Sequence, residues 1–401
     1  MEVRMKKIGF VTPWFGENIP GGAEALLRGV AVHLYEAGVN IEILTTCAKE
    51  FLSDWGADFY AEGVYTECGL TVRRFKVDHR DCEAFDLVNA KLMRGMKISP
   101  DEEAVFVDHM INSTNLYIYL KEHSDDYALY VFIPYMFGTT YHGCMVCPEK
   151  SVLIPCFHDE SYVYLNLFKK AFSQVAGMLF NAKAEARLAE ELFSTGNMAA
   201  EIIGVGINTD IRFDASRFSA KYKITSPFVL YMGRKDTGKN VDVLLRYFAE
   251  YKKRQHTDLK LVLTGGGTIG IPESVKKDVH DLGFISMEDK YDACAAAKVL
   301  CQPSSFESFS IVIMESWLCG RPVLVNAKCD VTKDFAAEAN AGLYYDNYFE
   351  FEGCLNYILQ NREAADEMGA NGRNFVLNNY TWDVVTDKYK RFFEKVSEAR
   401  E

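Results

Sequence analysis

The sequence predicts an α/β protein with two domains, each built on a mostly parallel sheet. Short apolar segments of strand length alternate with amphipathic segments of helix length along the whole chain, which is typical of repeated β-α units. The alternation restarts at Phe228–Met232, and 401 residues with 49% hydrophobic content are enough for two packed domains. We therefore expect two α/β halves in one chain.

The first half opens with an expected strand at 8–12, a helix at 23–37 and a second strand at 41–46. Residues 49–125 are acid-rich and less regular, and no element pattern is evident there. Three further short apolar segments have the length of strands of the same half. These lie at 130–133, 152–155 and 178–180.

The second half begins after a connection at 204–208 that contains two glycines and an asparagine, and we place the boundary between 203 and 217. After the strand at 228–232, further strands are expected at 261–264, 299–302 and 322–325. The apolar spacing of residues 381–396 predicts an amphipathic helix.

Charge and composition exclude several classes of protein. The net charge of −12 argues against a nucleic-acid partner, because such binding needs an excess of Lys and Arg on the contacting face. Eleven scattered cysteines fit a reducing cytoplasm better than a disulfide framework. No stretch reads as a signal peptide or a membrane span, so a cytoplasmic location is expected, with peripheral association at the inner face of the membrane left open.

The most informative segment covers residues 303–317 and carries two glutamates eight positions apart, Glu307 and Glu315. We expect Glu307 just before an apolar helix that begins near Ser308, and Glu315 inside it. At about 1.5 Å per residue the separation is about 12 Å, on the order of the distance from a hexose across a diphosphate to a ribose. The free N–H groups of the helix start would face the diphosphate. The alternative is a loop acid and a polar residue of a buried helix, which would then need a partner.

A basic turn at 233–240 follows the first strand of the second half and precedes a helix. Ligands of open α/β sheets bind at the carboxyl ends of the strands, so Arg234 and Lys239 are expected to project toward a ligand. A guanidinium and an ammonium group suit a leaving diphosphate, whose negative charge grows as a glycosidic bond breaks. The alternative interpretation is a solvated basic turn.

Two segments of the first half lie at similar strand ends. Pro20, Gly21 and Gly22 directly precede the first helix, and glycines there let the backbone approach a phosphate closely, although they do not form a full G-x-G-x-x-G fingerprint. His158 follows the strand at 152–155 and is expected at the same edge. A lone histidine is more often structural, so this residue is weak evidence by itself.

Together these segments resemble the family 4 glycosyltransferases, which are retaining enzymes of the GT-B fold. The matching features are the Gly-Gly loop, the His-Asp pair at 158–159, the Gly-Arg…Lys turn, the glycines at 265–267, the Glu…Glu pair and Tyr-Thr-Trp at 380–382. The resemblance covers nearly the whole chain and is strongest from about residue 178 onward. Their ordered combination is more specific than any single motif.

The resemblance implies two Rossmann-like domains that face each other across a cleft. Residues 1–205 would form an acceptor-binding domain and residues 206–380 a sugar-nucleotide-binding domain. A C-terminal helix at 381–401 would pack back on the first domain.

The resemblance also implies a role for each matching residue. Glu307 would hold the hydroxyls of the donor sugar, Glu315 would hold the ribose, and His158 would face the donor sugar near the acceptor. The candidate catalytic residues are His158, Arg234, Lys239 and Glu307, and the candidate donor-binding residues are Gly21, Gly22, Gly233, Gly265, Phe284, Ile285, Ser308, Phe309, Ser310 and Glu315. One departure is Asn240, which stands where the family commonly has glycine and calls the shape of that loop into question.

The expected reaction moves a hexose-like unit, with retention, from a UDP-, GDP- or ADP-linked sugar to a hydroxyl of a saccharide, lipid-linked or glycoprotein acceptor. It would belong to bacterial polysaccharide, glycolipid or glycoprotein glycan synthesis. The leaving phosphate would help to remove the acceptor proton. The sequence has no Asp-x-Asp motif, and two cations already face the diphosphate, so no metal ion or cofactor is expected.

The sequence also leaves other classes of function open. A nucleotide-sugar epimerase or hydrolase of the same fold would need no acceptor, and a catalytically silent subunit would bind the nucleotide sugar without turnover. A two-lobed solute-binding protein predicts an export signal and few free thiols, and the sequence has neither. Cys144 and Cys147, with His142 nearby, could bind zinc or act in redox chemistry, but no second cysteine pair lies at ligand spacing.

Overall fold

The computed structural model describes residues 6–19, 21–196 and 198–398 and divides into two compact units. Unit 1 comprises Met1–Gly206 together with Val385–Glu401, and unit 2 comprises Ile207–Val384. The chain leaves unit 1 within the predicted glycine-containing connection and re-enters it inside its last helix.

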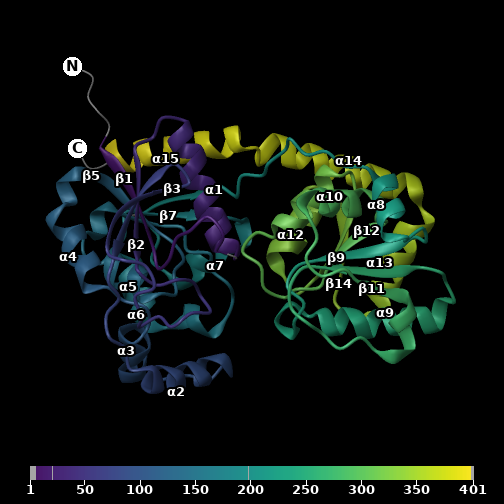
Figure 1. Cartoon of the computed structure of the whole chain (residues 1–401), viewed down its shortest axis with the longest axis horizontal. Helices are drawn as coiled ribbons and strands as arrows, with labels where there is room; N and C mark the ends of the chain where they lie inside the picture. The colour runs from purple at the N-terminus through teal and green to yellow at the C-terminus, as the bar shows by residue number, and fades with distance from the viewer. Residues whose placement is uncertain (1–5, 20, 197, 399–401) are drawn as a thin grey trace. The chain divides into compact units, whose positions relative to one another are not determined.

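Unit 1 contains an eight-stranded sheet in the order β3-β4-β2-β1-β5-β6-β7-β8. Figure 1 labels five of its strands, β1, β2, β3, β5 and β7. The β3–β4 pair is antiparallel, and every other pair of neighbours in this sheet is parallel. The strands are β1 (Lys7–Thr12), β2 (Ile41–Thr46), β3 (Gly63–Glu67), β4 (Leu70–Phe75), β5 (Tyr127–Phe132), β6 (Ser151–Leu153), β7 (Gly177–Phe180) and β8 (Ala199–Ile202). The helices are α1 (Gly22–Glu36), α2 (Cys82–Met93), α3 (Pro100–Asp108), α4 (Thr114–Glu122), α5 (Gly138–Cys144), α6 (Asn166–Phe172), α7 (Lys183–Leu192) and α15 (Trp382–Glu398).

Residues 49–125, the acid-rich and less regular region of the sequence, form regular elements in this unit. They include the β3–β4 hairpin and the helices α2, α3 and α4. Helix α3 shows why one of these forms, because Ser99 and Glu102 make a capping box and Pro100 occupies the first helical position. The acid-rich composition obscured this local signal.

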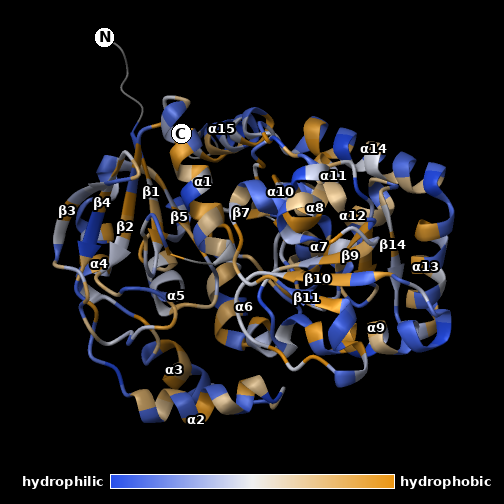
Figure 2. Ribbon diagram, turned by 45° about the vertical axis from the view of Figure 1, so that its right-hand side comes forward, coloured by the Kyte–Doolittle hydropathy of each residue, from blue (hydrophilic) through white to orange (hydrophobic). Residues whose placement is uncertain are grey.

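Unit 2 contains a six-stranded, fully parallel sheet in the order β11-β10-β9-β12-β13-β14. Its strands are β9 (Phe228–Met232), β10 (Lys260–Thr264), β11 (Val279–Asp281), β12 (Val299–Gln302), β13 (Val323–Asn326) and β14 (Gly342–Tyr345). Its helices are α8 (Ala215–Tyr222), α9 (Val241–Gln255), α10 (Met287–Ala296), α11 (Ile311–Leu318), α12 (Asp330–Glu338), α13 (Tyr348–Gln360) and α14 (Arg362–Asn379). The strands β9 and β10 are strongly hydrophobic, whereas α13 and α14 carry both hydrophobic and hydrophilic residues (Figure 2).

Helix α11 lies in the interior of unit 2, which explains its nearly continuous apolar sequence. Trp317 is fully buried and donates a hydrogen bond from Nε1 to the carbonyl of Ala341 at 2.9 Å. A Cβ on Gly372 of α14 would lie 2.3 Å from the Trp317 ring, so only glycine allows the two helices to approach this closely. The helix that carries Glu315 is therefore tightly packed.

Helix α15 completes the core of unit 1 with its segment from Val385 onward. A Cβ on Gly177 of β7 would lie 2.7 Å from the Phe392 ring, and Lys390 donates a hydrogen bond to the carbonyl of Ala37 at 2.7 Å. The side chains that α15 buries share one face of the helix: Val385, Thr386, Tyr389, Phe392, Phe393 and Val396.

None of the helices in the described part of the chain combines the length and the apolar character needed to cross a membrane.

Candidate functional site

The predicted site residues of unit 2 follow strands that run in the same direction. Gly233 and Arg234 follow β9, Gly265 follows β10, and Glu307 lies in the connection after β12. Because β9 pairs in parallel with both β10 and β12, these segments leave the sheet at one edge. This is the edge at which open α/β sheets bind ligands.

Glu307 and Lys239 form an ion pair. Lys239 Nζ lies 2.7 Å from Glu307 Oε1, with the glutamate side chain 13% exposed and the lysine 29% exposed. The two residues are 68 positions apart in sequence and come from the connections after β12 and β9. The structure thus brings a predicted sugar-binding carboxylate against a predicted phosphate-binding cation.

Two asparagines fix the connection that leads to Glu307. Asn240 Nδ2 donates to the carbonyl of Pro303 at 3.0 Å and to Ser305 Oγ at 2.8 Å. Asn326 Nδ2 reaches the same two acceptors at 2.9 and 3.3 Å. The sequence did not indicate either asparagine as a support for Glu307, because the partners are distant along the chain.

The backbone at Asn240 explains how the loop accommodates asparagine in place of the glycine that the resemblance leads us to expect. Asn240 adopts the left-handed conformation, with φ 55° and ψ 27°, directly before α9. Glycine adopts this region without strain, and asparagine tolerates it better than other residues with a Cβ. The loop therefore keeps the glycine-like backbone and gains two side-chain hydrogen bonds.

We expect Asn240→Gly to lower stability by about 1 to 2 kcal/mol, since it keeps the conformation but removes these hydrogen bonds. Asn240→Ala should be worse by a further 1 to 2 kcal/mol, roughly the strain of a left-handed residue with a Cβ. Thermal melting of the three proteins measures the order. Equal melting temperatures for the Gly and Ala variants would contradict the backbone requirement.

Arg234 is the most exposed of the predicted cations, at 69% of its side chain. Its guanidinium pairs with Asp236, a partner that the sequence analysis did not consider. Asp236 also accepts a hydrogen bond from the Lys239 backbone N–H at 2.9 Å. Burial raises the pKa of Asp236, but Arg234 and Lys239 outweigh that effect and lower it overall. The carboxylate therefore stays ionised and orders the turn.

Glu315 is buried, at 5% exposure, and is held from one side. Its Oε1 accepts hydrogen bonds from Lys290 Nζ at 2.5 Å and from the Tyr291 hydroxyl at 3.3 Å. Its Oε2 is also buried and has no hydrogen-bond partner in the described part of the chain. A buried carboxylate oxygen without a donor is costly, so this atom is a candidate ligand contact. Nothing in the sequence pointed to Lys290 or Tyr291 as its partners.

The helix that carries Glu315 begins later than predicted. It starts at Ile311 and not near Ser308, because Ser310 adopts a left-handed backbone with φ 72°. The estimate of about 12 Å between the two glutamates assumed a helical rise and does not apply to residues 307–310. Phe309 is 3% exposed, with its ring centroid 5.2 Å from Phe335 and 5.1 Å from Tyr380. Its side chain belongs to the core, so only its backbone is available to contact a ligand.

Gly233 and Gly265 lie where two strand ends approach most closely. A Cβ on Gly265 would lie 2.1 Å from the Gly233 carbonyl oxygen, and Gly265 has φ +114°. Phe284 is 86% exposed, and its ring lies against Gly266, where a Cβ would meet it at 2.8 Å. Phe284 and Ile285 follow β11, so they leave the sheet at the same edge as the glycines.

In unit 1, Gly21 and Gly22 lie at the start of α1, and Pro20 is outside the described residues. Gly21 has φ +140°, and a Cβ there would lie 1.9 Å from the Glu24 carboxylate. Glu24 accepts a hydrogen bond from Trp14 Nε1 at 2.7 Å. The backbone conformation of the turn therefore favours glycine here, whatever it binds.

His158 is partly exposed, and its Nδ1 lies 3.5 Å from Glu160 Oε1. The loop before it is held by a buried glutamate that the sequence analysis missed. Glu185, at the start of α7, accepts backbone hydrogen bonds from Phe157 and Asn181, both at 2.7 Å. Burial raises the pKa of Glu185 to about 8. Glu185 thus joins the loops after β6 and β7 and fixes the backbone next to His158.

The cysteine pair suggested as a metal or redox site is buried. Cys144 is fully buried, which raises its thiol pKa, and its Sγ lies 3.4 Å from the carbonyl of Tyr141. His142 lies 3.1 Å from Asp108. Across residues 6–19, 21–196 and 198–398, no three His, Cys, Asp or Glu side chains gather closely enough to hold a metal ion.

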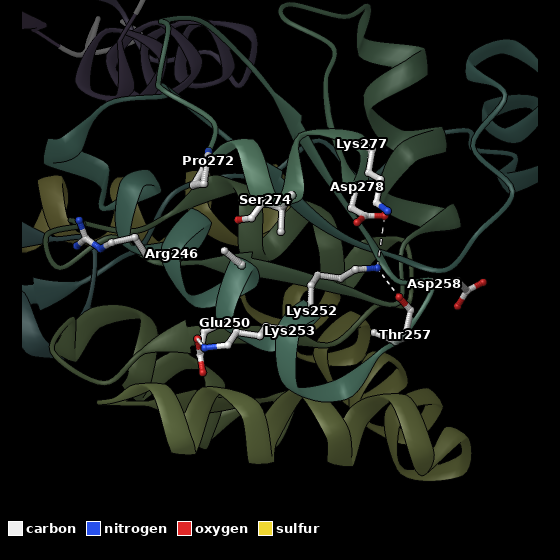
Figure 3. Close-up of a pocket in the computed structure, with 12 residues that line it drawn as sticks. Arg246, Glu250, Lys252, Lys253, Thr257, Asp258, Pro272, Ser274, Lys277 and Asp278 are labelled. Carbon is white, nitrogen blue, oxygen red and sulfur yellow. Dashed lines mark hydrogen bonds and ion pairs between the residues drawn. The ribbon is translucent and has the colours of Figure 1, made fainter.

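A hollow at the other end of the second sheet contains none of the predicted residues (Figure 3). It lies between the last turns of α9 and the segment before β11, and charged residues dominate its lining. Lys252 crosses its floor, pairing with Asp278 at 3.4 Å and donating to the carbonyl of Leu259 at 3.0 Å. The ammonium group of this mostly buried lysine therefore already has partners within the protein, and we assign this hollow no donor-binding role.

Comparison with known proteins finds a family model that matches part of the chain. The model of the family described as "Glycosyl transferases group 1" matches residues 213–375, which include Arg234, Lys239, Glu307 and Glu315. A D-inositol 3-phosphate glycosyltransferase from Nocardioides sp. is 24% identical over 258 residues, 56% of each chain. The chain thus spans about half the length of the curated relatives that it matches.

Solved structures match the fold over nearly the whole chain. Sucrose-phosphate synthase from Thermosynechococcus elongatus gives a TM-score of 0.69 at 16% identity, covering 98% of this chain and 100% of that one. Anabaena HepE, solved in complex with UDP and glucose, gives 0.65 at 14% identity, with coverages of 97% and 99%. The family model thus matches part of the second unit, and the solved structures show that the chain has the GT-B fold.

Proposed function

We propose that this protein transfers a hexose-type sugar from a nucleoside diphosphate sugar to an acceptor hydroxyl, with retention of anomeric configuration. Unit 2 would bind the donor at the edge where Arg234, Lys239 and Glu307 leave the sheet. The acceptor would be a saccharide, a lipid-linked sugar or a glycoprotein glycan, and the reaction would take place in the cytoplasm or at the inner face of the membrane. The match of residues 213–375 to the glycosyltransferase family model supports this assignment.

The observation that carries the proposal is the half-satisfied carboxylate of Glu315. Lys290 and Tyr291 hold Oε1, while the buried Oε2 has no partner in the described residues. Vicinal ribose hydroxyls are donors that would satisfy this oxygen, and leaving it unsatisfied costs about 1 to 3 kcal/mol. A nucleotide ribose is therefore the ligand group that we place here.

The Lys239–Glu307 pair would open when the donor binds. Lys239 and Arg234 would then both contact the diphosphate, and Glu307 would accept hydrogen bonds from the sugar hydroxyls. Cations held in place before the reaction stabilise the charge that develops on the leaving group. The leaving phosphate would then accept the acceptor proton, and His158 of unit 1 would face the donor sugar. With two cations available, we propose a reaction that needs no metal ion.

Isothermal titration with UDP, GDP and ADP tests the donor site, beginning with UDP, the nucleotide bound in HepE. We expect one nucleotide to bind and Glu315→Gln to weaken its affinity by tenfold or more, since the change replaces an acceptor with a donor at a buried position. Glu363→Gln, an exposed position on α14, is the matched control and should bind normally. Unchanged affinity in Glu315→Gln would remove the ribose assignment, and a folded protein that binds none of the three would refute the donor site.

A further inference from the structure

Unit 1 contains a small polar hollow that no residue of the predicted site lines. Its volume is about 230 Å³, and it is formed by the loops after β1 and β2 together with the end of β3. This is smaller than the roughly 300 to 1,000 Å³ of pockets that enclose a drug-sized ligand, and it suits a single sugar-sized ring. The lining residues are Gly16, Glu17, Asn18, Ile19, Lys49, Glu50, Tyr60 and Glu67.

Carboxylates dominate the charge of this hollow. Three glutamates and one lysine line it, so the lining stays acidic even when the pairing of Glu67 with Arg74 is taken into account. The lysine, Lys49, lies 3.5 Å from Glu50, and its ammonium group lies 5.2 Å from the centre of the Phe59 ring. The one cation of the lining is therefore already engaged by a carboxylate and a ring.

A buried arginine behind the lining holds the hollow in shape. Arg74 donates from Nη2 to Glu67 Oε2 at 2.6 Å and to the carbonyl of Phe15 at 2.9 Å, and its guanidinium lies 4.0 Å from the centre of the Tyr60 ring. Glu67 Oε1 accepts the backbone N–H of Glu17 at 3.1 Å. Glu67 neutralises the arginine charge, so Arg74 braces the loop and the ring without offering the hollow a free cation. Its Nη1 is also buried and has no hydrogen-bond partner in the described residues, but Arg74 is not among the residues that line the hollow.

We propose that this hollow binds a neutral, hydroxyl-rich ring of the acceptor and rejects phosphorylated polyols. Carboxylates accept hydrogen bonds from sugar hydroxyls, and the Tyr60 ring offers an apolar face to the C–H groups of a sugar. A phosphate placed here would be repelled by the negative charge of the lining. Among the described residues that line the hollow, no unengaged cation offsets this repulsion, which salt screens only weakly at a partly buried site. The inference rests on the proposed function, because it assigns the acceptor of that reaction to unit 1.

The proposed acceptor class distinguishes this chain from its relatives named D-inositol 3-phosphate glycosyltransferase. An acceptor that carries a phosphate needs a cation in its site, and here glutamates occupy the lining. The substrate class that fits is a free or glycosidically linked neutral sugar. This assignment concerns residues before 213, which lie outside the segment matched by the family model.

The test is saturation-transfer NMR and titration of the full chain with matched pairs of probes. The neutral probes are methyl α-D-glucopyranoside and myo-inositol, and the charged ones are glucose 6-phosphate and D-myo-inositol 3-phosphate. We expect at least one neutral probe to bind, and its phosphate to bind at least tenfold more weakly. Tyr60→Ala should abolish neutral binding. Glu17→Lys should reduce the discrimination by tenfold or more, whereas Glu122→Lys on α4 makes the same charge change away from the hollow and should leave it unchanged.

Equal or tighter binding of the phosphates to the unmodified protein would overturn the proposal. So would the absence of binding by every neutral probe in protein shown to be folded. UDP titration of the same sample tests the donor site separately. Sugar binding without nucleotide binding would refute the proposed function and not the hollow, whereas nucleotide binding without sugar binding would refute the hollow alone.

Discussion

Glu307→Gln is expected to lower kcat by about a hundredfold or more, the usual scale for losing one preorganised polar contact to a transition state. The change keeps the size of the side chain but removes the charge that pairs with Lys239 at 2.7 Å. Arg234→Ala should lower kcat by a similar factor, because the developing charge on the diphosphate loses one of its two cations. Release of nucleoside diphosphate from the donor sugar in the presence of acceptor measures both effects.

The melting temperature separates a chemical effect from an unfolded protein. Glu307 is partly exposed and lies in a connection, so Glu307→Gln should melt close to the unmodified protein. Glu363→Gln again serves as the matched control, with normal kcat. Turnover close to normal in both Glu307→Gln and Arg234→Ala would show that the reaction takes place elsewhere.

Gly265→Ala is expected to cause the largest loss of stability at the donor site. The added Cβ would lie 2.1 Å from the Gly233 carbonyl oxygen, which is backbone and cannot move aside as a side chain can. The φ of +114° adds conformational strain, and the two effects together should cost about 2 to 5 kcal/mol. Nucleotide affinity should fall with it, because the ends of β9 and β10 must separate.

Gly270→Ala provides the control in the same connection. A Cβ there would meet nothing within 4 Å, so this variant should melt and bind nucleotide as the unmodified protein does. Chemical unfolding with titration of the nucleotide measures both quantities. If Gly265→Ala is stable and binds nucleotide normally, the ends of β9 and β10 accommodate a Cβ at this position, which contradicts the prediction.

The elements of the second sheet could be predicted because parallel strands buried on both faces read as continuous apolar runs. The strand at 228–232 and the strand at 299–302 were predicted with their observed bounds. The match of residues 213–375 to a glycosyltransferase family model agrees with the resemblance seen in the order of the motifs. Strand β14 was missed because Gly342–Tyr345 is short and only its last residue is buried.

The details of the site were harder to predict because they depend on partners that are distant in sequence. Lys290 meets Glu315 across 25 residues, and Asn240 meets Ser305 across 65. The late start of α11 depends on one backbone conformation, that of Ser310, which a pattern of apolar residues does not encode. Motif order therefore identified the residues, while tertiary contacts decided how each one is held.

The return of the chain at Val385 affects how the protein is made. Residues 385–398 belong to the first unit, yet they are translated after the whole second unit. All residues of the second unit are therefore synthesised before those of the first are complete. Until then Phe392 is not in place against Gly177 of β7. We therefore expect the amino-terminal half of the nascent chain to be the part that most needs protection from aggregation during synthesis.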